Sequence, residues 1–425
     1  MNTVVIILFI IAYIGIVFEH VIHINKAAIA LIFGSICWTV IGMSSDNLPV
    51  VINDLQTHMI DIGELVFFLL GAMTIVELID AHDGFQTIAE IIKTTNKTKL
   101  VWTIALVSFF LSAILDNLTT TIVMVSILNK LIEHKKTKWL LLGLIIISAN
   151  AGGAWSPIGD VTTTMLWIGG QITSWNIIQQ TFLASFTCMA IPTLIINYKI
   201  DSTILISSQE YKNENFIQKK ADRNIVLIMG ICCFLMIPIF HQVTHLPPFM
   251  GMLFCLGLMW MLTGILHHRK SEEEKGVLSV NHALRKIDVP SILFFTGILL
   301  CVTALEVTGT LTAIAHWMDH SIGNLYVING GIGLLSSVLD NIPLVAGIQN
   351  MYPLSTYPTD HYFWELLTFC AGTGGSCLII GSAAGVVVMG LEKMSFIWYL
   401  KNITWIALVG FISGIGVFVA QHLLT

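Results

Sequence analysis

The sequence predicts an all-α polytopic membrane protein made of two inverted-topology repeats, with about ten spans, two re-entrant hairpins and two broken helices. Three observations lead to this fold class. Of the 425 residues, 55% are hydrophobic and 11% are charged, and the mean hydropathy is +0.83. A chain this apolar folds in a bilayer, where helices are the default structure. The tripeptide Leu-Asp-Asn occurs twice, at 115–117 and 339–341, and all 20 basic residues can be placed on one side of the membrane.

The two Leu-Asp-Asn tripeptides belong to a duplication of roughly 200 residues. Asp116 corresponds to Asp340 at an offset of 224, and a glycine frame at 152–159 returns at 374–381 at an offset of 222. An offset that changes so little along the chain indicates two copies of one unit. The predicted organisation is a first repeat at 1–198, a polar cytoplasmic linker at 199–223 and a second repeat at 224–425.

Ten apolar segments are predicted to cross the membrane, because a helical span requires ~20 residues. The first segment has no basic residue before it, so we expect a retained span and not a cleaved signal peptide. All eight cysteines fall within apolar segments, so neither a disulfide framework nor a zinc site is predicted. The predicted spans are 3–20, 25–43, 62–79, 138–170, 178–198, 224–241, 249–266, 290–308, 363–391 and 397–420.

Two further segments, 100–130 and 321–352, are predicted to be re-entrant hairpins. Each arm around Asp116 has about 15 residues, too few for a span. Lysines flank both ends of 100–130 and place them in the cytoplasm, whereas 321–352 has no Lys or Arg at either end. The second hairpin is therefore expected to enter from the opposite side. Five crossings per repeat give the two halves opposite orientations and place both termini outside.

The segments 138–170 and 363–391 are predicted to be broken helices. Glycines and Pro157 interrupt the first, and the same Gly-Gly frame interrupts the second. An unwound centre exposes backbone carbonyls, which a membrane protein tolerates only inside the protein or beside a wet cavity, where they can bind a hard cation. The broken helices and the hairpin tips are therefore where we expect the chemistry.

An ion site is the predicted reason for carboxylates in such apolar sequence, because an ionisable residue inside a membrane is costly. Asp116 and Asp160 lie in the first half and Asp340 alone in the second, so the predicted site is asymmetric. Oxygen ligands suit Na⁺ and similar hard cations, and a carboxylate also accepts H⁺, so the two ions can compete. The predicted cation- and proton-binding residues are Asp116, Asn117, Asn150, Asp160, Thr162, Thr163, Ser336, Asp340, Asn341, Ser376 and Ser382, with Na⁺ at Asp116, Asn117, Asp160, Asp340 and Asn341, and no cofactor is expected.

Each of these residues also has a structural alternative. The aspartates can cap helices that start at their positions, the glycines can serve close helix packing, and the hydroxyls can bond their own helix. Glu64 begins the third predicted span, where an acid favours the helix N-terminus. Glu77 falls in the last turn of that span, where the helix dipole disfavours it. Both glutamates are candidates for a proton pathway.

The segments 63–82, 115–121, 150–164 and 339–343 resemble the NhaD-type sodium/proton antiporters of the ion transporter superfamily. The resemblance covers nearly the full length of the chain. It implies that Na⁺, and also Li⁺, leaves a bacterial cytoplasm across the inner membrane in exchange for H⁺. It also implies a homodimer in which a transport region moves like an elevator against a scaffold, and functional roles for Glu64 and the cation- and proton-binding residues given above.

The sequence disfavours three other functions. Related sodium/dicarboxylate carriers have Ser-Asn-Thr at the hairpin tips, whereas both tips here read Leu-Asp-Asn, which disfavours an anionic substrate. An intramembrane aspartyl protease needs a Gly-x-Gly-Asp element, and this chain offers Ile158-Gly159-Asp160 after Pro157. Hairpins from opposite faces suit a gated central site better than a channel. The prediction is a transporter and not an enzyme, with membrane lipid but no nucleic acid as a partner.

Overall fold

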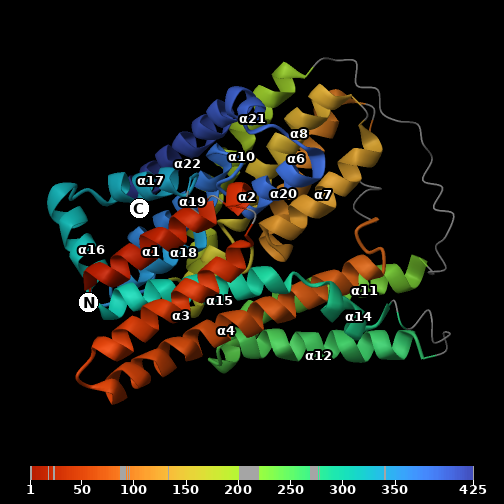
Figure 1. Cartoon of the computed structure of the whole chain (residues 1–425). Coiled ribbons are helices and arrows are strands. Elements are labelled where there is room, and N and C mark those ends of the chain that lie inside the picture. Colours follow the sequence, from red (N-terminus) through yellow and green to blue (C-terminus); the bar gives the residue numbers. More distant parts are fainter. Residues whose placement is uncertain are drawn as a thin grey trace.

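The computed structural model is a bundle of α-helices, with no β-strand in the part of the chain that it describes (Figure 1). This confirms the predicted all-α membrane class. Large apolar side chains such as Ile239, Ile265 and Ile412 are at least 60% exposed on the outer helix faces, as expected for a surface that meets lipid. The described residues are 2–17, 19–22, 24–86, 92, 94, 96–132, 134–200, 220–268, 276, 278–338 and 341–424.

The first half consists of long helices and shorter, interrupted ones. The side chains of Asn25 and Asn96 cap α3 and α6, each accepting a hydrogen bond from a backbone N–H of the first turn. The helices of this half are α1 (Asn2–Val17), α2 (Glu19–Ile22), α3 (Lys26–Ser44), α4 (Leu48–Ala81), α6 (Lys97–Leu115), α7 (Asn117–Leu131), α8 (Lys135–Gly153), α9 (Val161–Ile168) and α10 (Ser174–Lys199).

The second half follows a similar order. Ser279, Asp288 and Asn324 cap α14, α15 and α17 through their side chains. Two of its helices, α14 and α16, were not predicted. The helices of this half are α11 (Lys220–Thr244), α12 (Pro248–Leu266), α14 (Val280–Lys286), α15 (Val289–Val307), α16 (Thr310–Ser321), α17 (Leu325–Leu335), α18 (Asn341–Met351), α19 (Tyr362–Gly374), the 3-10 turn η1 (Gly375–Cys377), α20 (Ala383–Glu392), α21 (Phe396–Asn402) and α22 (Thr404–Leu424).

The helices form two groups that lie against each other (Figure 1). In one group, α3 packs on α15, α4 on α12, and α11 on α12. In the other, α6 and α7 pack on α8, α17 packs on α19, and α10 packs on α22. The groups meet where α18 contacts α15 and where α11 contacts α6. The segments predicted to carry the chemistry therefore lie together in the second group, beside a wall formed by the first.

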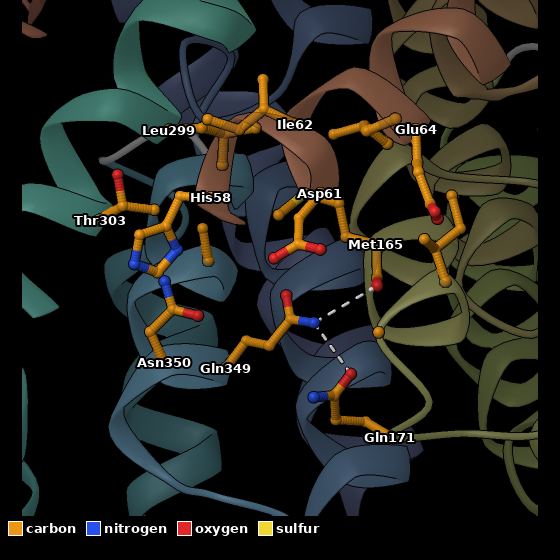
Figure 2. Close-up of a pocket in the computed structure, with 14 residues that line it drawn as sticks. His58, Asp61, Ile62, Glu64, Met165, Gln171, Leu299, Thr303, Gln349 and Asn350 are labelled. Carbon is orange, nitrogen blue, oxygen red and sulfur yellow. Dashed lines mark hydrogen bonds between the residues drawn. The ribbon is translucent and has the colours of Figure 1, made fainter. Parts of the chain in front are cut away.

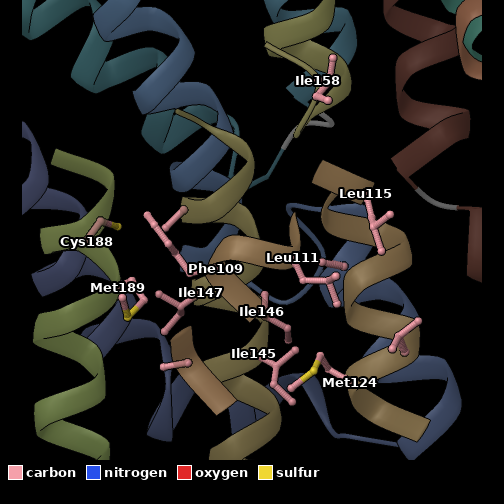
Figure 3. Close-up of a cluster of buried hydrophobic side chains, with 14 of the residues drawn as sticks. Phe109, Leu111, Leu115, Met124, Ile145, Ile146, Ile147, Ile158, Cys188 and Met189 are labelled. Carbon is pink, nitrogen blue, oxygen red and sulfur yellow. The ribbon is translucent and has the colours of Figure 1, made fainter. Parts of the chain in front are cut away.

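Glycines bring the backbones of neighbouring helices into contact in each half. A Cβ on Gly152 would lie 2.1 Å from Phe109 O, and a Cβ on Gly374 would lie 2.0 Å from Gly333 O, so neither position has room for a side chain. Phe109 and Gly333 are separated by the same offset of 224 as Asp116 and Asp340. Around the first contact, apolar side chains of α6, α7, α8 and α10 form a dense core (Figure 3).

A pair of serines repeats the correspondence between the halves. Ser112 Oγ donates a hydrogen bond to Ala149 O (2.6 Å), and Ser336 Oγ donates one to Ala371 O (2.8 Å). Contacts of one half therefore recur in the other at the spacing of the sequence duplication.

The number of membrane-crossing helices differs from the predicted ten. Eight described helices are long and apolar enough to cross, or nine if the bent pair α20 and α21 counts as one span. With 16 residues α1 falls short, and neither predicted broken helix counts as a single span. By contrast, α6, predicted as a hairpin arm, has 19 residues and is long enough to cross.

The third and the last predicted spans have other limits than expected. Helix α4 has 34 residues and starts at Leu48, so the predicted 62–79 covers only its second part. The added turns contain Asn53, His58 and Asp61, whose polarity conceals the helix from a hydropathy profile. The predicted 397–420 is two helices, α21 and α22, which meet at Ile403.

The chain is interrupted close to the positions predicted for the hairpin tips and broken helices. Asp116 alone separates α6 from α7, and these two helices contact each other. Residues 154–160 separate α8 from α9, and residues 378–382 separate η1 from α20. Between α17 and α18, residues 339 and 340 lie outside the described part of the chain, as do residues 201–219 of the predicted linker.

The opposite orientation of the two hairpins stays a prediction, which cysteine labelling tests. In a background without the eight native cysteines, Lys136→Cys should react with an impermeant maleimide only from the cytoplasm. Leu354→Cys should react only from outside, because no basic residue holds that end of the second hairpin inside. Both positions are exposed. Labelling of both from the same side would refute the inverted arrangement.

Candidate functional site

Predicted site residues of both halves meet at the break between α8 and α9. Asp160 lies in this break and is 3% exposed. Asp160 Oδ1 accepts a hydrogen bond from Asn117 Nδ2 (3.4 Å), and its Oδ2 accepts from Asn341 Nδ2 (3.3 Å) and Thr162 Oγ1 (2.7 Å). Because Asn117 starts α7 and Asn341 starts α18, this single carboxylate joins the first residues of two helices, one from each half.

Asp160 occupies the N-cap position of α9, but its side chain makes no cap hydrogen bond. The alternative that this aspartate only caps its helix is therefore wrong. Gly372 of α19 faces the carboxylate, since a Cβ there would lie 3.4 Å from Asp160 Oδ2. The carboxylate is thus enclosed by the broken helices of both halves.

Asp116 makes the cap that Asp160 does not make. Its Oδ1 accepts from Thr119 N (2.7 Å) and its Oδ2 accepts from Thr119 Oγ1 (2.9 Å), at the start of α7. Its backbone has φ 98° and ψ 161°, a conformation that favours glycine and costs another residue ~1–3 kcal/mol. A carboxylate kept at the hairpin tip despite this cost indicates a functional need for it. Capping and ion binding are compatible, because each oxygen keeps a further lone pair.

Asn150 of α8 connects the two halves through its amide. Its Nδ2 donates to Ser376 Oγ and to Ser382 Oγ, both at 2.9 Å, and its Oδ1 accepts from Asn117 Nδ2 at 3.0 Å. All four residues are buried. The sequence separates Asn150 from Ser382 by 232 residues, and the fold places them in direct contact.

The remaining predicted residues divide into two kinds. Ser336 and Thr163 are buried nearby, but their hydroxyls donate to backbone carbonyls, of Ala371 (2.8 Å) and Gly153 (3.5 Å). These bonds agree with the structural alternative for hydroxyl groups, but each oxygen keeps its lone pairs, so a role of these two residues in cation binding stays a prediction. Asp340 lies outside the described residues, so its place in the site stays a prediction.

A cavity of about 400 Å³ lies near this network (Figure 2). Helix α9 leads into it from Asp160, and α18 leads into it from Asn341, so each helix begins at the network and ends at the cavity wall. At 1.5 Å per residue, Met165 in the wall is about 8 Å along α9 from Asp160. The polar side chains of the wall are His58, Asp61, Glu64, Gln171, Thr303, Gln349 and Asn350.

The two glutamates predicted for a proton pathway lie in different surroundings. Glu64 lines the cavity. It is not at a helix N-terminus, because α4 starts at Leu48, so the structural alternative for this residue is wrong. Glu77 forms an ion pair with Lys286 of α14 (Oε1 to Nζ 3.1 Å), a helix that hydropathy did not predict.

Sequence analysis missed two acids and a histidine beside the cavity. His58 Nε2 lies 3.9 Å from Glu306 Oε2 of α15, and Asp61 lies next to Glu64 in the wall (Figure 2). The available signal was the spacing of His58, Asp61 and Leu65, which are three and four residues apart and therefore share one face of a helix.

The fold and the site define a polytopic α-helical transporter, with a buried oxygen-rich site where the first residues of α7 and α18 meet the break between α8 and α9. The sequence matches the citrate transporter family, CitMHS, over residues 6–368, and the chain belongs to this family. The predicted class, a transporter and not an enzyme, is confirmed by this membership and by the relatives of the chain.

Several of those relatives are named as antiporters. The sodium/proton antiporter 1 of Arabidopsis thaliana is 44% identical over 416 residues, which cover 98% of this chain and 72% of that protein. The Na⁺/H⁺ antiporter NhaD of Alkalimonas amylolytica is 30% identical over 443 residues, covering 96% and 88%. The NhaD of Vibrio cholerae is 30% identical over 438 residues, covering 96% and 89%. The resemblance to NhaD-type antiporters is thereby confirmed.

Proposed function

We propose that the protein exchanges Na⁺ for H⁺ across a membrane. The observation that carries this proposal is the buried Asp160 carboxylate, which neutral donors of both hairpin tips hold in place. Carboxylate, amide and hydroxyl oxygens suit an alkali cation, and the same carboxylate can hold a proton instead. A group that binds either ion, but not both, exchanges them when it faces each side of the membrane in turn. The names of the relatives support the same pair of ions.

The finer parts of the proposal come from the sequence and its resemblance. Cytoplasmic Na⁺, and also Li⁺, leaves in exchange for external H⁺. The membrane is a bacterial inner membrane, both chain termini lie outside, and two chains form a homodimer. Asp116 and Asp340 complete the cation site together with Asn117, Asp160 and Asn341.

A sodium-coupled carrier of citrate-like anions is the second candidate, because the family is described as citrate transporters. Two features of the site favour exchange over this candidate. The first hairpin tip places Asp116 directly before the site amide of Asn117. The Asp160 carboxylate lies 3.4 Å from that amide, so an anion bound there would meet a buried negative charge and be repelled.

Reconstitution of the full chain into liposomes that contain a pH-sensitive dye separates the two candidates. With the membrane potential clamped by valinomycin and K⁺, an antiporter takes up external Na⁺ and releases luminal H⁺, so the lumen becomes alkaline without any organic anion. Li⁺ should give the same response. A carrier of the second kind would show Na⁺-dependent uptake of labelled citrate and no pH change with Na⁺ alone, and that result would overturn the proposal.

Glu64→Gln should slow exchange more than it weakens Na⁺ binding. Glu64 lines the cavity near the network, and its charge raises the local concentration of cations there. We expect about a fivefold lower rate at low Na⁺ and a Na⁺ affinity within about twofold of wild type. The dye assay gives the rate and ²²Na⁺ binding gives the affinity. Thr303→Val, a neutral change in the same wall, is the matched control; equal rates for the two variants would remove Glu64 from the access route.

A further inference from the structure

We infer that Ser376 and Ser382 are positioning residues, which orient the hairpin-tip amide of Asn117 through Asn150 and do not bind the ion themselves. The inference rests on the proposed function, because it concerns the same cation site. It divides the residues that the sequence grouped as cation ligands into those that contact the ion and those that set the direction of a ligand.

The first step is the orientation of Asn150. An asparagine side chain has one acceptor oxygen and one nitrogen with two N–H donors. Asn150 Nδ2 donates to both serines, to Ser376 Oγ and to Ser382 Oγ at 2.9 Å each, which uses both N–H groups. Its Oδ1 therefore faces the other way, towards the first hairpin tip. Because Asn150 is fully buried, water does not compete for these bonds.

The second step carries this orientation to Asn117. Asn117 Nδ2 donates to Asn150 Oδ1 (3.0 Å) and to Asp160 Oδ1 (3.4 Å), so its own two N–H groups are also used. Its Oδ1 consequently points away from these two acceptors. A cation binds an amide through the oxygen and is repelled by the N–H₂ group. If Asn150 were turned round, two amide nitrogens would face each other, and Asn117 would have to turn its nitrogen towards the ion.

The third step concerns the lone pairs of Ser382. Ser382 Oγ accepts from Gly385 N (3.3 Å), which caps α20, as well as from Asn150 Nδ2. A hydroxyl oxygen has two lone pairs, so none remains on Ser382 for a cation while both bonds are kept. Ser382 therefore acts as a hydrogen-bond acceptor for Asn150 and not as a ligand of the cation.

The hydrogen bonds that lead from Ser376 and Ser382 through Asn150 to Asn117 form a relay. This relay runs in one direction only, from the second half to the first. At the offset of 222, Gly372 stands where the first half has Asn150, and Ser382 stands where it has Asp160. At these two positions the second half thus lacks the amide and the carboxylate, and its Ser376 and Ser382 supply the hydroxyls that hold the amide of Asn150. The asymmetry of the duplicated sequence has a physical role in this arrangement, because at these two positions the first half supplies groups of the ion site and the second half supplies the hydroxyls that fix their geometry.

Equilibrium binding of ²²Na⁺ to the full-length protein in detergent tests the relay. Ser376→Ala and Ser382→Ala should each weaken Na⁺ binding by about twofold, because the remaining serine still holds the Asn150 amide. The double variant should weaken it by about tenfold, or about 1.4 kcal/mol, more than the two single effects together. In an Asn150→Ala background, both serine substitutions should have no further effect.

Thr368→Val is the matched control, because it removes another buried hydroxyl of the same broken helix, one that donates to Trp364 O (2.8 Å). It should leave the Na⁺ affinity unchanged. The relay would be overturned if the fold-loss of Na⁺ affinity in the double variant equalled the product of the losses in the two single variants. It would also be overturned if the serine substitutions still weakened Na⁺ binding in the Asn150→Ala background. Either result would show that the serines bind Na⁺ themselves. Lower thermal stability with unchanged Na⁺ affinity would show a purely structural role and would overturn it as well.

Failure of the relay can be told apart from failure of the proposed function by the wild-type protein. If wild type binds Na⁺ and exchanges it for H⁺, but the loss of Na⁺ affinity in the double serine variant is only the product of the two single losses, only the relay is wrong. If wild type neither binds Na⁺ nor exchanges it, the proposed function is wrong, and the relay falls with it. If Asn150→Ala binds no measurable Na⁺, the comparison of the single and double serine variants decides by itself.

Discussion

Asp160→Asn is expected to abolish Na⁺/H⁺ exchange, with a loss of at least about 100-fold. The carboxylate of Asp160 accepts hydrogen bonds from Asn117, Asn341 and Thr162. An asparagine there keeps the shape but loses the negative charge and the exchangeable proton. Its own N–H₂ group would also face the N–H₂ group of Asn117 or Asn341. The Na⁺-induced pH change in liposomes measures the exchange, and ²²Na⁺ binding shows whether the cation is lost as well.

Asp360→Asn is the matched control for this change. Asp360 accepts hydrogen bonds from Thr173 N (2.6 Å) and Thr173 Oγ1 (2.8 Å) in loops outside the network, and its positive φ of 62° is one that asparagine tolerates. This variant should keep its exchange activity. Wild-type exchange by a well-folded Asp160→Asn protein would show that the ion site lies elsewhere.

Gly374→Ala should destabilise the protein by about 3 kcal/mol, the upper end of the range for overpacked cores. The added methyl would lie 2.0 Å from Gly333 O, and this obstacle is backbone of α17, which cannot turn away as a side chain can. Gly152→Ala should have a comparable effect, because its methyl would lie 2.1 Å from Phe109 O. The melting temperature of the purified protein in detergent and the yield of monodisperse material measure the effect.

Gly416→Ala provides the comparison for both glycine variants. Gly416 lies in α22, and a Cβ there would have no neighbour within 4 Å. Alanine is the better helix former, so this variant should be at least as stable as wild type. If Gly374→Ala and Gly416→Ala melted at the same temperature, the close approach of α17 and α19 would not be a stabilising contact.

Sequence reasoning predicted the long apolar helices well, because a bilayer requires such helices and their composition shows it directly. Helices α3, α12 and α15 start and end within three residues of the predicted limits. The prediction of helix limits failed where the composition of a segment does not reveal its structure. The part of α4 that precedes residue 62 contains His58 and Asp61, polar residues that line a cavity, and the junction of α21 and α22 at Ile403 has no glycine or proline to mark it.

The site was predicted as a set of residues, and its connections were not. Duplication and membrane depth identified Asn117, Asp160 and Asn341, which the structure brings together. Which aspartate caps a helix could not be predicted, because Asp116 and Asp160 both precede helices and their different backbone angles and neighbours depend on the folded structure. The contact of Asn150 with two serines of the other half depends on how the halves approach, and neither hydropathy nor local spacing contains that information.

The glycine contacts restrict which parts of the protein can slide past each other. Where two helices come into backbone contact at a glycine, as α8 and α6 do at Gly152 and α19 and α17 do at Gly374, no flexible side chain at that point can yield to shear. A displacement of Asp160 would therefore carry its neighbouring helices along as one solid piece. Slip is easiest at the boundary of that piece with α4 and α15, where the cavity replaces dense packing. The volume of this cavity is then the quantity that should change most between the two ends of a transport cycle.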